Sequence, residues 1–324
     1  MKRDLGQGAI VITGASSGIG RAASLAFARQ GCRVVLAARS AELLDEIVAE
    51  CEQAGGAALA IPTDTTDLAA VRELAERAAE FGGGKISVWV NNAGVAAFGL
   101  FLDVPVEAHE QVLRTNLIGY LYGAHAALPL FERQGSGVLI NVVSLAGLVP
   151  TPLAASYSAS KFGNRGLFDA VRSEFAGSGK DIHVCDLHPA FVDTPFLEHT
   201  ANYEGRAINP VPPVIAVERV ADEIVAIARR PRPSTSLGAL APVATFFHTA
   251  LPGLYRWSVG KSARAYLTLA PGAPRTEGGL NGPSPGSHDL HGNLRSPRAR
   301  LVGGVLAAGA LLGAARLIRG RGRD

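Results

Sequence analysis

Short apolar, β-branched runs alternate with longer helical stretches over roughly the first 230 residues, and this alternation limits the possible folds more than any other feature. The predicted strands are Ala9–Thr13, Arg33–Ala38, Ala57–Ile61, Ser87–Asn91, Gly137–Val143 and Ile182–Leu187. The predicted helices are Ile19–Gln30, Ala41–Ala54, Leu68–Phe81, Glu107–Gln134, Ser156–Ala176 and Val217–Arg230. Nearly continuous apolar strands joined by helices are typical of a parallel sheet covered on both faces. The sequence therefore predicts an α/β fold with a doubly wound parallel sheet.

A glycine loop, Thr13-Gly-Ala-Ser-Ser-Gly-Ile-Gly20, joins the first predicted strand to the first predicted helix. Glycines let a pyrophosphate approach the backbone, and the helix N-terminus offers unpaired N–H groups and a favourable dipole. The spacing T-G-x-x-x-G-x-G in this context favours nucleotide binding over a plain strand–turn–helix connection. We therefore expect a dinucleotide to contact Gly14, Ser16, Ser17, Gly18, Ile19 and Gly20.

The second predicted strand ends in Leu36-Ala-Ala-Arg39-Ser40, and the first acidic residue after it is Glu42. In NAD-binding folds an acidic side chain at this point hydrogen-bonds the adenosine ribose. An arginine can instead pair with the 2′-phosphate of NADP through charge-assisted hydrogen bonds. The alternative is that Arg39 is a solvated loop residue. The missing acid favours the first interpretation, so the sequence predicts NADP(H) in preference to NAD(H).

Tyr157 and Lys161 lie four residues apart in Ser156-Tyr-Ser-Ala-Ser-Lys161, so they share one face of a helix. A free phenol has a pKa of about 10, and a nearby ammonium group favours the phenolate and lowers that pKa. Ser144, thirteen residues before Tyr157, can hydrogen-bond a substrate oxygen. The set suits proton transfer to or from an alcohol or carbonyl oxygen. The alternatives are a packing tyrosine and a serine that merely ends a strand.

Three further motifs occur in order with these: Asp64-Thr-Thr-Asp67, Asn91-Asn-Ala-Gly94 and Arg114-Thr-Asn-Leu117. Over roughly residues 5–230 the chain resembles the short-chain dehydrogenase/reductase family, in its shorter, single-domain branch. The resemblance implies a Rossmann-type fold and hydride transfer between NAD(P)H and a carbonyl/alcohol pair. Sugar epimerases and dehydratases of the longer branch usually carry T-G-x-x-G-x-x-G, which this chain lacks.

The resemblance also implies individual roles. Tyr157 would be the proton donor or acceptor, Lys161 would lower its pKa and hold the nicotinamide ribose, and Ser144 would polarise the substrate oxygen. Asn116 would hold a water that links Lys161 to solvent. Further cofactor contacts are expected from Asp64, Thr65, Asn91, Ala93, Gly94, Pro189, Val192 and Thr194. Taken alone, Asn116 could instead interrupt a helix by bonding to backbone, and Asn91 could end a strand.

One motif departs from the family pattern. Where the family usually has Pro-Gly after the sixth strand, this chain has His188-Pro-Ala190. Alanine restricts the backbone more than glycine does, which affects the cofactor contacts expected from Val192 and Thr194. His188 is interpreted as a strand-end residue rather than an extra acid–base group.

The segment Phe196–Ala216 follows the expected cofactor cleft and is the natural substrate lid. Its apolar and aromatic side chains favour a lipophilic alcohol or carbonyl substrate, with ordinary loop packing as an equally good interpretation. A different class of function, a membrane-associated NADP-binding scaffold with little turnover, is disfavoured by the intact Ser–Tyr–Lys set.

Beyond the predicted Rossmann-type catalytic domain (1–234), three segments follow. Residues 235–270 are an apolar extension that could cover the substrate, form an interface or contact a membrane, 271–300 have the composition of a flexible linker, and 301–324 are an apolar helix with a basic end. The run 301–318 is about 27 Å long as a helix, just short of a hydrocarbon core of about 30 Å. Whether it spans a membrane, lies on one or packs elsewhere stays open, so we expect a cytoplasmic protein with a possible membrane contact.

Charge and cysteine usage limit the partners. Residues 295–324 carry seven arginines and one acid, a net charge of +6, whereas the rest of the chain carries −3. The basic end has no interleaved aromatic residues, which argues against nucleic acid. Three scattered cysteines without a Cys/His cluster indicate no disulfide framework and no metal site, in keeping with a reducing cytosol. By resemblance we expect a homo-oligomer.

Overall fold

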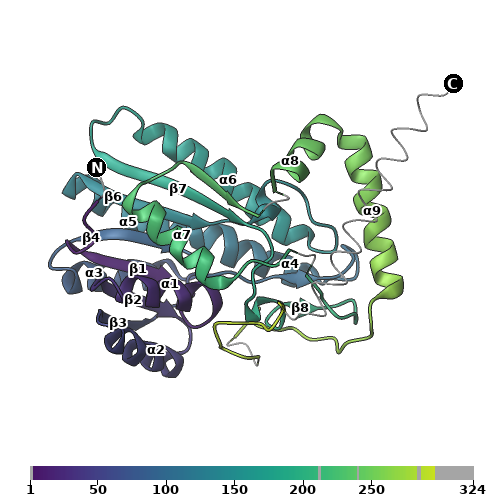
Figure 1. Ribbon diagram of the computed structural model, residues 1–324, viewed down its shortest axis with the longest axis horizontal. Helices are drawn as coiled ribbons and strands as arrows, with labels where there is room; N and C mark the ends of the chain where they lie inside the picture. Colours follow the sequence, from purple (N-terminus) through teal and green to yellow (C-terminus); the bar gives the residue numbers. More distant parts are fainter. Residues whose placement is uncertain (1–2, 211–212, 239–240, 283–285, 296–324) are drawn as a thin grey trace.

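The computed structural model describes residues 3–210, 213–238, 241–282 and 286–295. At its centre is a seven-stranded sheet with the order β3-β2-β1-β4-β6-β7-β9, in which every pairing is parallel (Figure 1). The strands are β1 (Ala9–Thr13), β2 (Arg33–Ala38), β3 (Ala57–Pro62), β4 (Ile86–Asn91), β6 (Ser136–Val142), β7 (Asp181–Pro189) and β9 (Ser234–Leu237). The chain runs outward from β1 to β3 and then returns to place β4 beside β1. This reversal confirms the predicted Rossmann-type fold.

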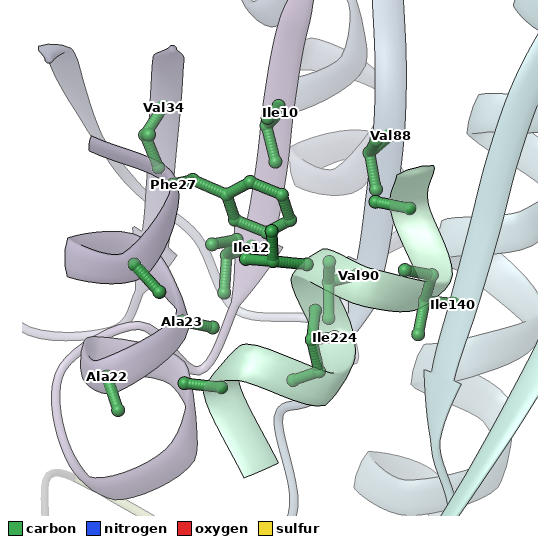
Figure 2. Packing of buried hydrophobic residues seen from close by; sticks show 14 of the residues in the cluster. Ile10, Ile12, Ala22, Ala23, Phe27, Val34, Val88, Val90, Ile140 and Ile224 are labelled. Atoms are coloured by element: carbon green, nitrogen blue, oxygen red, sulfur yellow. The ribbon is translucent and has the colours of Figure 1, made fainter. Parts of the chain in front are cut away.

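Helices cover both faces of the sheet. One face is covered by α1 (Gly18–Ala28), α2 (Ala41–Gln53) and α7 (Val217–Arg229), and the other by α3 (Leu68–Phe81), α5 (Gly119–Gln134) and α6 (Ala155–Phe175). Because side chains alternate along a strand, Ile10 and Ile12 pack under the first group and Ala9 and Val11 under the second. Figure 2 shows the Phe27 ring of α1 against the β1 isoleucines.

The predicted helix Glu107–Gln134 is interrupted. The structure has α4 (Val106–Leu113), a π-helical turn (Arg114–Ile118) and then α5. Within that turn the carbonyl of Asn116 accepts a hydrogen bond from Asn164 Nδ2 on α6, at 2.8 Å. A neighbouring helix therefore supplies a partner for this backbone group, which apolar periodicity does not reveal.

The chain after α7 is more regular than its sequence suggested. β9 extends the sheet past residue 234, and residues 235–270, which showed no clear periodicity, contain α8 (Ala241–Ala250) and α9 (Pro252–Leu269). None of the residues of α9 is fully buried, so the packing of this helix does not require an apolar stripe along one face. The sequence of α9 therefore shows no helical periodicity. A short pair of strands, β5 (Ala97–Phe98) and β8 (Ala201–Asn202), lies beside the main sheet.

Residues 271–282 and 286–295, which we call the strap, belong to the predicted linker. In the structure they lie against the domain, with bridges from Thr276 to Asn202 and from Gly272 to Arg206. The predicted helix 301–318 lies outside the described residues. Among the helices that the structure describes, none is both long and apolar enough to cross a bilayer.

Phe27 tests the packing of the core. Phe27→Ala removes a fully buried ring between α1 and the sheet and should lower the free energy of unfolding by about 3–5 kcal/mol. Phe246→Ala makes the same change at a side chain that is 64% exposed and should change it by less than about 0.5 kcal/mol. Urea unfolding of both variants measures the difference; equal losses would contradict the assigned core.

Candidate active site

A cavity of about 350 Å³ lies at the carboxyl ends of the central strands, where the strand order reverses. This is where ligands bind in open parallel sheets. Its wall contains most of the predicted cofactor residues and three of the four predicted catalytic residues: Gly14, Ser16, Ser17, Gly18, Ile19, Arg39, Asp64, Thr65, Ala93, Gly94, Pro189, Val192, Thr194, Ser144, Tyr157 and Lys161. The predicted residues Gly20, Asn91 and Asn116 are not on this wall.

The glycine loop fits a dinucleotide because its backbone is exposed where side chains would intrude. Gly14 and Gly18 have φ angles of 66° and 48°, which favour glycine. A Cβ on Gly14 would come within 2.8 Å of the Cα of Ala93, and one on Gly18 within 3.0 Å of Thr194. At Gly20 a Cβ would lie 2.1 Å from the Gly14 carbonyl oxygen, so this glycine allows the turn to close, and its predicted cofactor contact stays a prediction.

Asn91 was predicted to contact the cofactor, but the structure places its side chain inside the domain. Its Nδ2 donates to Asn141 Oδ1 and to the Tyr120 carbonyl, and its Oδ1 accepts from Trp89 Nε1. The next residue, Asn92, lies on the cavity wall instead. Alternation along a strand puts neighbours on opposite sides, and the sequence pattern Asn-Asn did not indicate which one faces the cleft.

Ser144 follows β6 with a φ angle of 134°, a strained value for a residue with a Cβ. Its Oγ accepts a hydrogen bond from the Ala146 N–H at 3.1 Å, which leaves the hydroxyl hydrogen to be donated within the cavity. His188 Nδ1 lies 3.2 Å from the Ser144 carbonyl oxygen, and burial lowers the pKa of His188. His188 is therefore a buried strand-end residue, as the sequence indicated, and the structure adds that it contacts the Ser144 carbonyl.

Tyr157 and Lys161 both come from the first half of α6, and they meet at the cavity wall. Lys161 Nζ lies 5.6 Å from the centre of the Tyr157 ring. It donates to the Val142 carbonyl at 3.0 Å and to Tyr120 Oη at 3.4 Å. The ammonium group thus lies beside the Tyr157 ring, while its described hydrogen bonds go to other groups.

The expected lowering of the Tyr157 pKa is not seen in this arrangement. Burial raises that pKa, and a hydrogen bond with Ser144 opposes the rise. Burial lowers the pKa of Lys161 to about 7. The reason is that the lysine is almost completely enclosed, so its charged form is itself disfavoured and is only partly populated at neutral pH.

Asn116 is fully buried in the π-helical turn and joins three parts of the domain. Its Oδ1 accepts from the Val95 N–H and its Nδ2 donates to the Val95 carbonyl, both at 2.8 Å. Nδ2 also lies 3.2 Å from Ser160 Oγ on α6. The side chain bonds to the backbone of a loop beyond its own helix, and so fixes α6 relative to the cavity wall formed by residues 92–95.

The replacement of glycine by Ala190 introduces no backbone strain. In the described part of the chain, positive φ angles outside glycine occur at Ser144, Leu153 and Asn293. The Ala190 N–H donates to the Leu237 carbonyl at 2.8 Å, and Gly238, with a φ of 133°, provides the space that the methyl group needs. The extra strand β9 therefore accommodates the departure from the family pattern, and Val192 and Thr194 still reach the cavity wall.

The predicted lid supplies part of the cavity. Phe196 and Leu197 line it, and the ring centres of Phe196 and Tyr157 are 5.9 Å apart. Phe191 and Val149 add further apolar surface. In the part of the chain that the structure describes, no group of three or more His, Cys, Asp or Glu side chains could hold a metal ion.

Comparison with known proteins identifies the family. The model of a family described as short chain dehydrogenase matches residues 8–204. The chain belongs to this family. As a short chain dehydrogenase it is an oxidoreductase of a family that uses nicotinamide cofactors, and the glycine loop described above fits such a cofactor.

Individual relatives and solved structures agree with this assignment. An uncharacterized oxidoreductase of Bacillus subtilis is 33% identical over 294 residues, which cover 90% of this chain and 82% of the relative. A short-chain type dehydrogenase/reductase from Mycobacterium marinum is 27% identical with a TM-score of 0.65, covering 74% and 96%. A metagenomic short-chain oxidoreductase in complex with NADP is 27% identical with a TM-score of 0.61, covering 72% and 97%.

The lowered pKa of Lys161 predicts how the stability of this short chain dehydrogenase depends on pH. Between pH 7 and about 10.5 the unfolded chain holds a proton on Lys161 that the folded chain has lost, so stability should rise with pH. From pH 7 to pH 9 this contributes about 2 kcal/mol. Lys161→Met should remove that increment. Urea unfolding of both proteins at the two pH values measures it; identical pH dependence would show that Lys161 is not the cause.

Proposed function

We propose that this short chain dehydrogenase transfers a hydride between NADP(H) and the carbonyl/alcohol group of a lipophilic substrate. The observation that carries the proposal is that Ser144, Tyr157 and Lys161 meet on the wall of the cavity that the glycine loop also lines. One side chain from the turn after β6 and two from α6 converge on one space next to the expected dinucleotide. Such convergence suits proton transfer coupled to hydride transfer.

Bound in the cleft, the nicotinamide would supply or accept the hydride. For reduction, the Tyr157 hydroxyl gives its proton to the carbonyl oxygen of the substrate. The raised pKa of Tyr157 keeps that hydroxyl protonated and ready to donate at neutral pH. Ser144 would donate its hydroxyl hydrogen to the same substrate oxygen in place of its hydrogen bond with Tyr157, with its Oγ oriented by the Ala146 N–H. Lys161 in its protonated form stabilises the phenolate that remains.

Arg39 supports NADP(H) over NAD(H). It follows β2 on the cavity wall, at the position where NAD-binding folds carry an acid, and there it could pair with the 2′-phosphate of NADP. Its described hydrogen bond goes to the neutral carbonyl of Gly279, at 2.9 Å. A phosphate is a stronger acceptor for a guanidinium group than a carbonyl is. The NADP complex of the similar metagenomic oxidoreductase is consistent with this preference.

An apolar substrate is supported by Phe191, Phe196 and Leu197, which form the cavity wall beside Tyr157. Outside the cavity, the hairpin α8–α9 exposes large apolar side chains such as Phe246 and Trp257, which are 64% and 53% exposed. The hairpin contains three basic and no acidic residues. We infer that it contacts an anionic membrane surface, together with residues 301–318, which lie outside the described residues. A homo-oligomer remains a prediction from the family.

The proton-transfer role predicts the effect of Tyr157→Phe. This variant keeps the ring and removes only the hydroxyl, so turnover should fall at least about 1000-fold while NADPH binding changes less than about threefold. The assay follows NADPH absorbance with a panel of lipophilic ketones, and fluorescence titration gives the affinity for NADPH. Tyr122→Phe serves as the control for loss of a phenol elsewhere. Undiminished turnover by the Tyr157 variant would overturn its role in proton transfer, whereas no turnover by the wild type would support the alternative of a cofactor-binding scaffold.

The cofactor preference predicts the effect of Arg39→Asp. Removing the cation and adding an anion beside the 2′-phosphate should lower the ratio of kcat/KM for NADPH to that for NADH by about 100-fold. Arg33→Asp makes the same change at the opposite end of β2 and should leave the ratio within about twofold. Steady-state kinetics with both cofactors tests this. An unchanged ratio in the Arg39 variant would remove this residue from the cofactor site.

A further inference from the structure

The strap contacts the side of the cavity formed by the glycine loop, α1 and β2. The Gly279 carbonyl accepts from Arg39 Nη2 at 2.9 Å, and the Asp289 carbonyl accepts from the Gly18 N–H at 3.1 Å. The His288 carbonyl accepts from Arg21 Nη1 at 3.0 Å. Three backbone carbonyls of the strap therefore lie along the edge where the phosphates of a dinucleotide are expected.

The strap also contacts the opposite side, formed by the lid and the loop after β7. The Gly279 N–H donates to the His199 carbonyl at 2.9 Å, and His199 Nε2 lies 2.7 Å from the Ser287 carbonyl. The Leu294 N–H donates to Asp193 Oδ1 at 2.7 Å. The strap thus bridges the two sides of the cleft, and two of its residues, Gly279 and His288, are part of the cavity wall.

Two leucines hold the strap in place. Leu280 is only 1% exposed and packs in a cluster with Val104 and Val112 at the substrate side. Leu290 packs against the main core on the α1 side of the sheet, as do Ile19 and Val192. Complete burial of a leucine side chain is worth about 1.5 to 3 kcal/mol, which applies to Leu280, and the partly buried Leu290 contributes less. The described strap residues are therefore anchored on each side of the cleft.

We propose that the strap is a component of the dinucleotide site, which closes the outer side of the cleft and retains NADP(H). This inference rests on the function proposed above. In this structure, neutral backbone carbonyls of the strap accept hydrogen bonds from Arg39 and from the Gly18 N–H. The charged phosphates of the cofactor are stronger acceptors and would replace these carbonyls as partners of the same donors. The exchange of acceptors leaves both leucine anchors in place, so the strap closes over the cofactor. The dinucleotide leaves only when the strap opens.

Variants of the anchors test retention in the full-length chain. Leu280→Ser and Leu290→Ser should each raise the dissociation rate constant of NADPH at least about tenfold, with little change in the association rate constant. Leu254→Ser makes the same substitution on the exposed face of α9 and should release NADPH at the wild-type rate. Stopped-flow fluorescence after mixing the NADPH complex with excess NADP⁺ gives the rates. Unchanged release from both anchor variants, or tighter binding by them, would overturn the proposal.

Hydrogen exchange of the unaltered protein gives a second test that does not depend on variant folding. Adding NADPH should slow amide exchange at least about tenfold in residues 276–282 and 286–294 as well as in residues 13–20. Slower exchange in 13–20 alone, or faster exchange in the strap, would overturn the strap proposal and leave the proposed function standing. No protection in either region would instead show that NADPH does not bind, and the proposed function itself would fail.

Discussion

The close contact between the glycine loop and the turn after β4 is the constraint on which the cavity depends. The Thr13 hydroxyl accepts from the Asn92 and Ala93 N–H groups, and Asn92 Nδ2 donates to the carbonyls of Thr13 and Gly14. These bonds join the ends of β1 and β4, the two strands between which the chain order reverses. The loop can approach so closely only because Gly14 has no side chain. The contact fixes the backbone N–H groups of α1 at the mouth of the cleft.

The side chains proposed for catalysis are held on the other side of the same cleft by α6 and the turn after β6. Asn116 joins α6 to the cleft wall through Val95 and Ser160, and His188 supports the strained backbone of Ser144. The surroundings that position Lys161 also disfavour its charge, so its pKa falls to about 7. Rigid placement and a perturbed pKa therefore have one cause, which is burial at the sheet edge.

The C-terminal part of the chain adds to this framework instead of only following it. β9 extends the sheet and gives Ala190 its hydrogen-bonding partner, and the strap returns from α9 across the cleft. A stretch rich in glycine, proline and serine has the composition of a linker, yet Leu280 and Leu290 give it anchors. Two leucines in such a stretch predict little from sequence alone, because they anchor the segment only if each one reaches an apolar surface in the folded protein.

By itself the sequence determined the parallel α/β fold and the glycine loop, because these follow from local periodicity, and the spacing of Tyr157 and Lys161 predicted that they share one face of a helix. Ser144 was added to that set on the family resemblance. The tertiary structure decided which of Asn91 and Asn92 faces the cleft, that Gly20 serves packing, that Asn116 lies in a π-helical turn, and where the strap goes. Each of these depends on partners far away in the chain. A pattern of neighbouring residues carries no information about such partners, since they meet only after the sheet and its helices have packed.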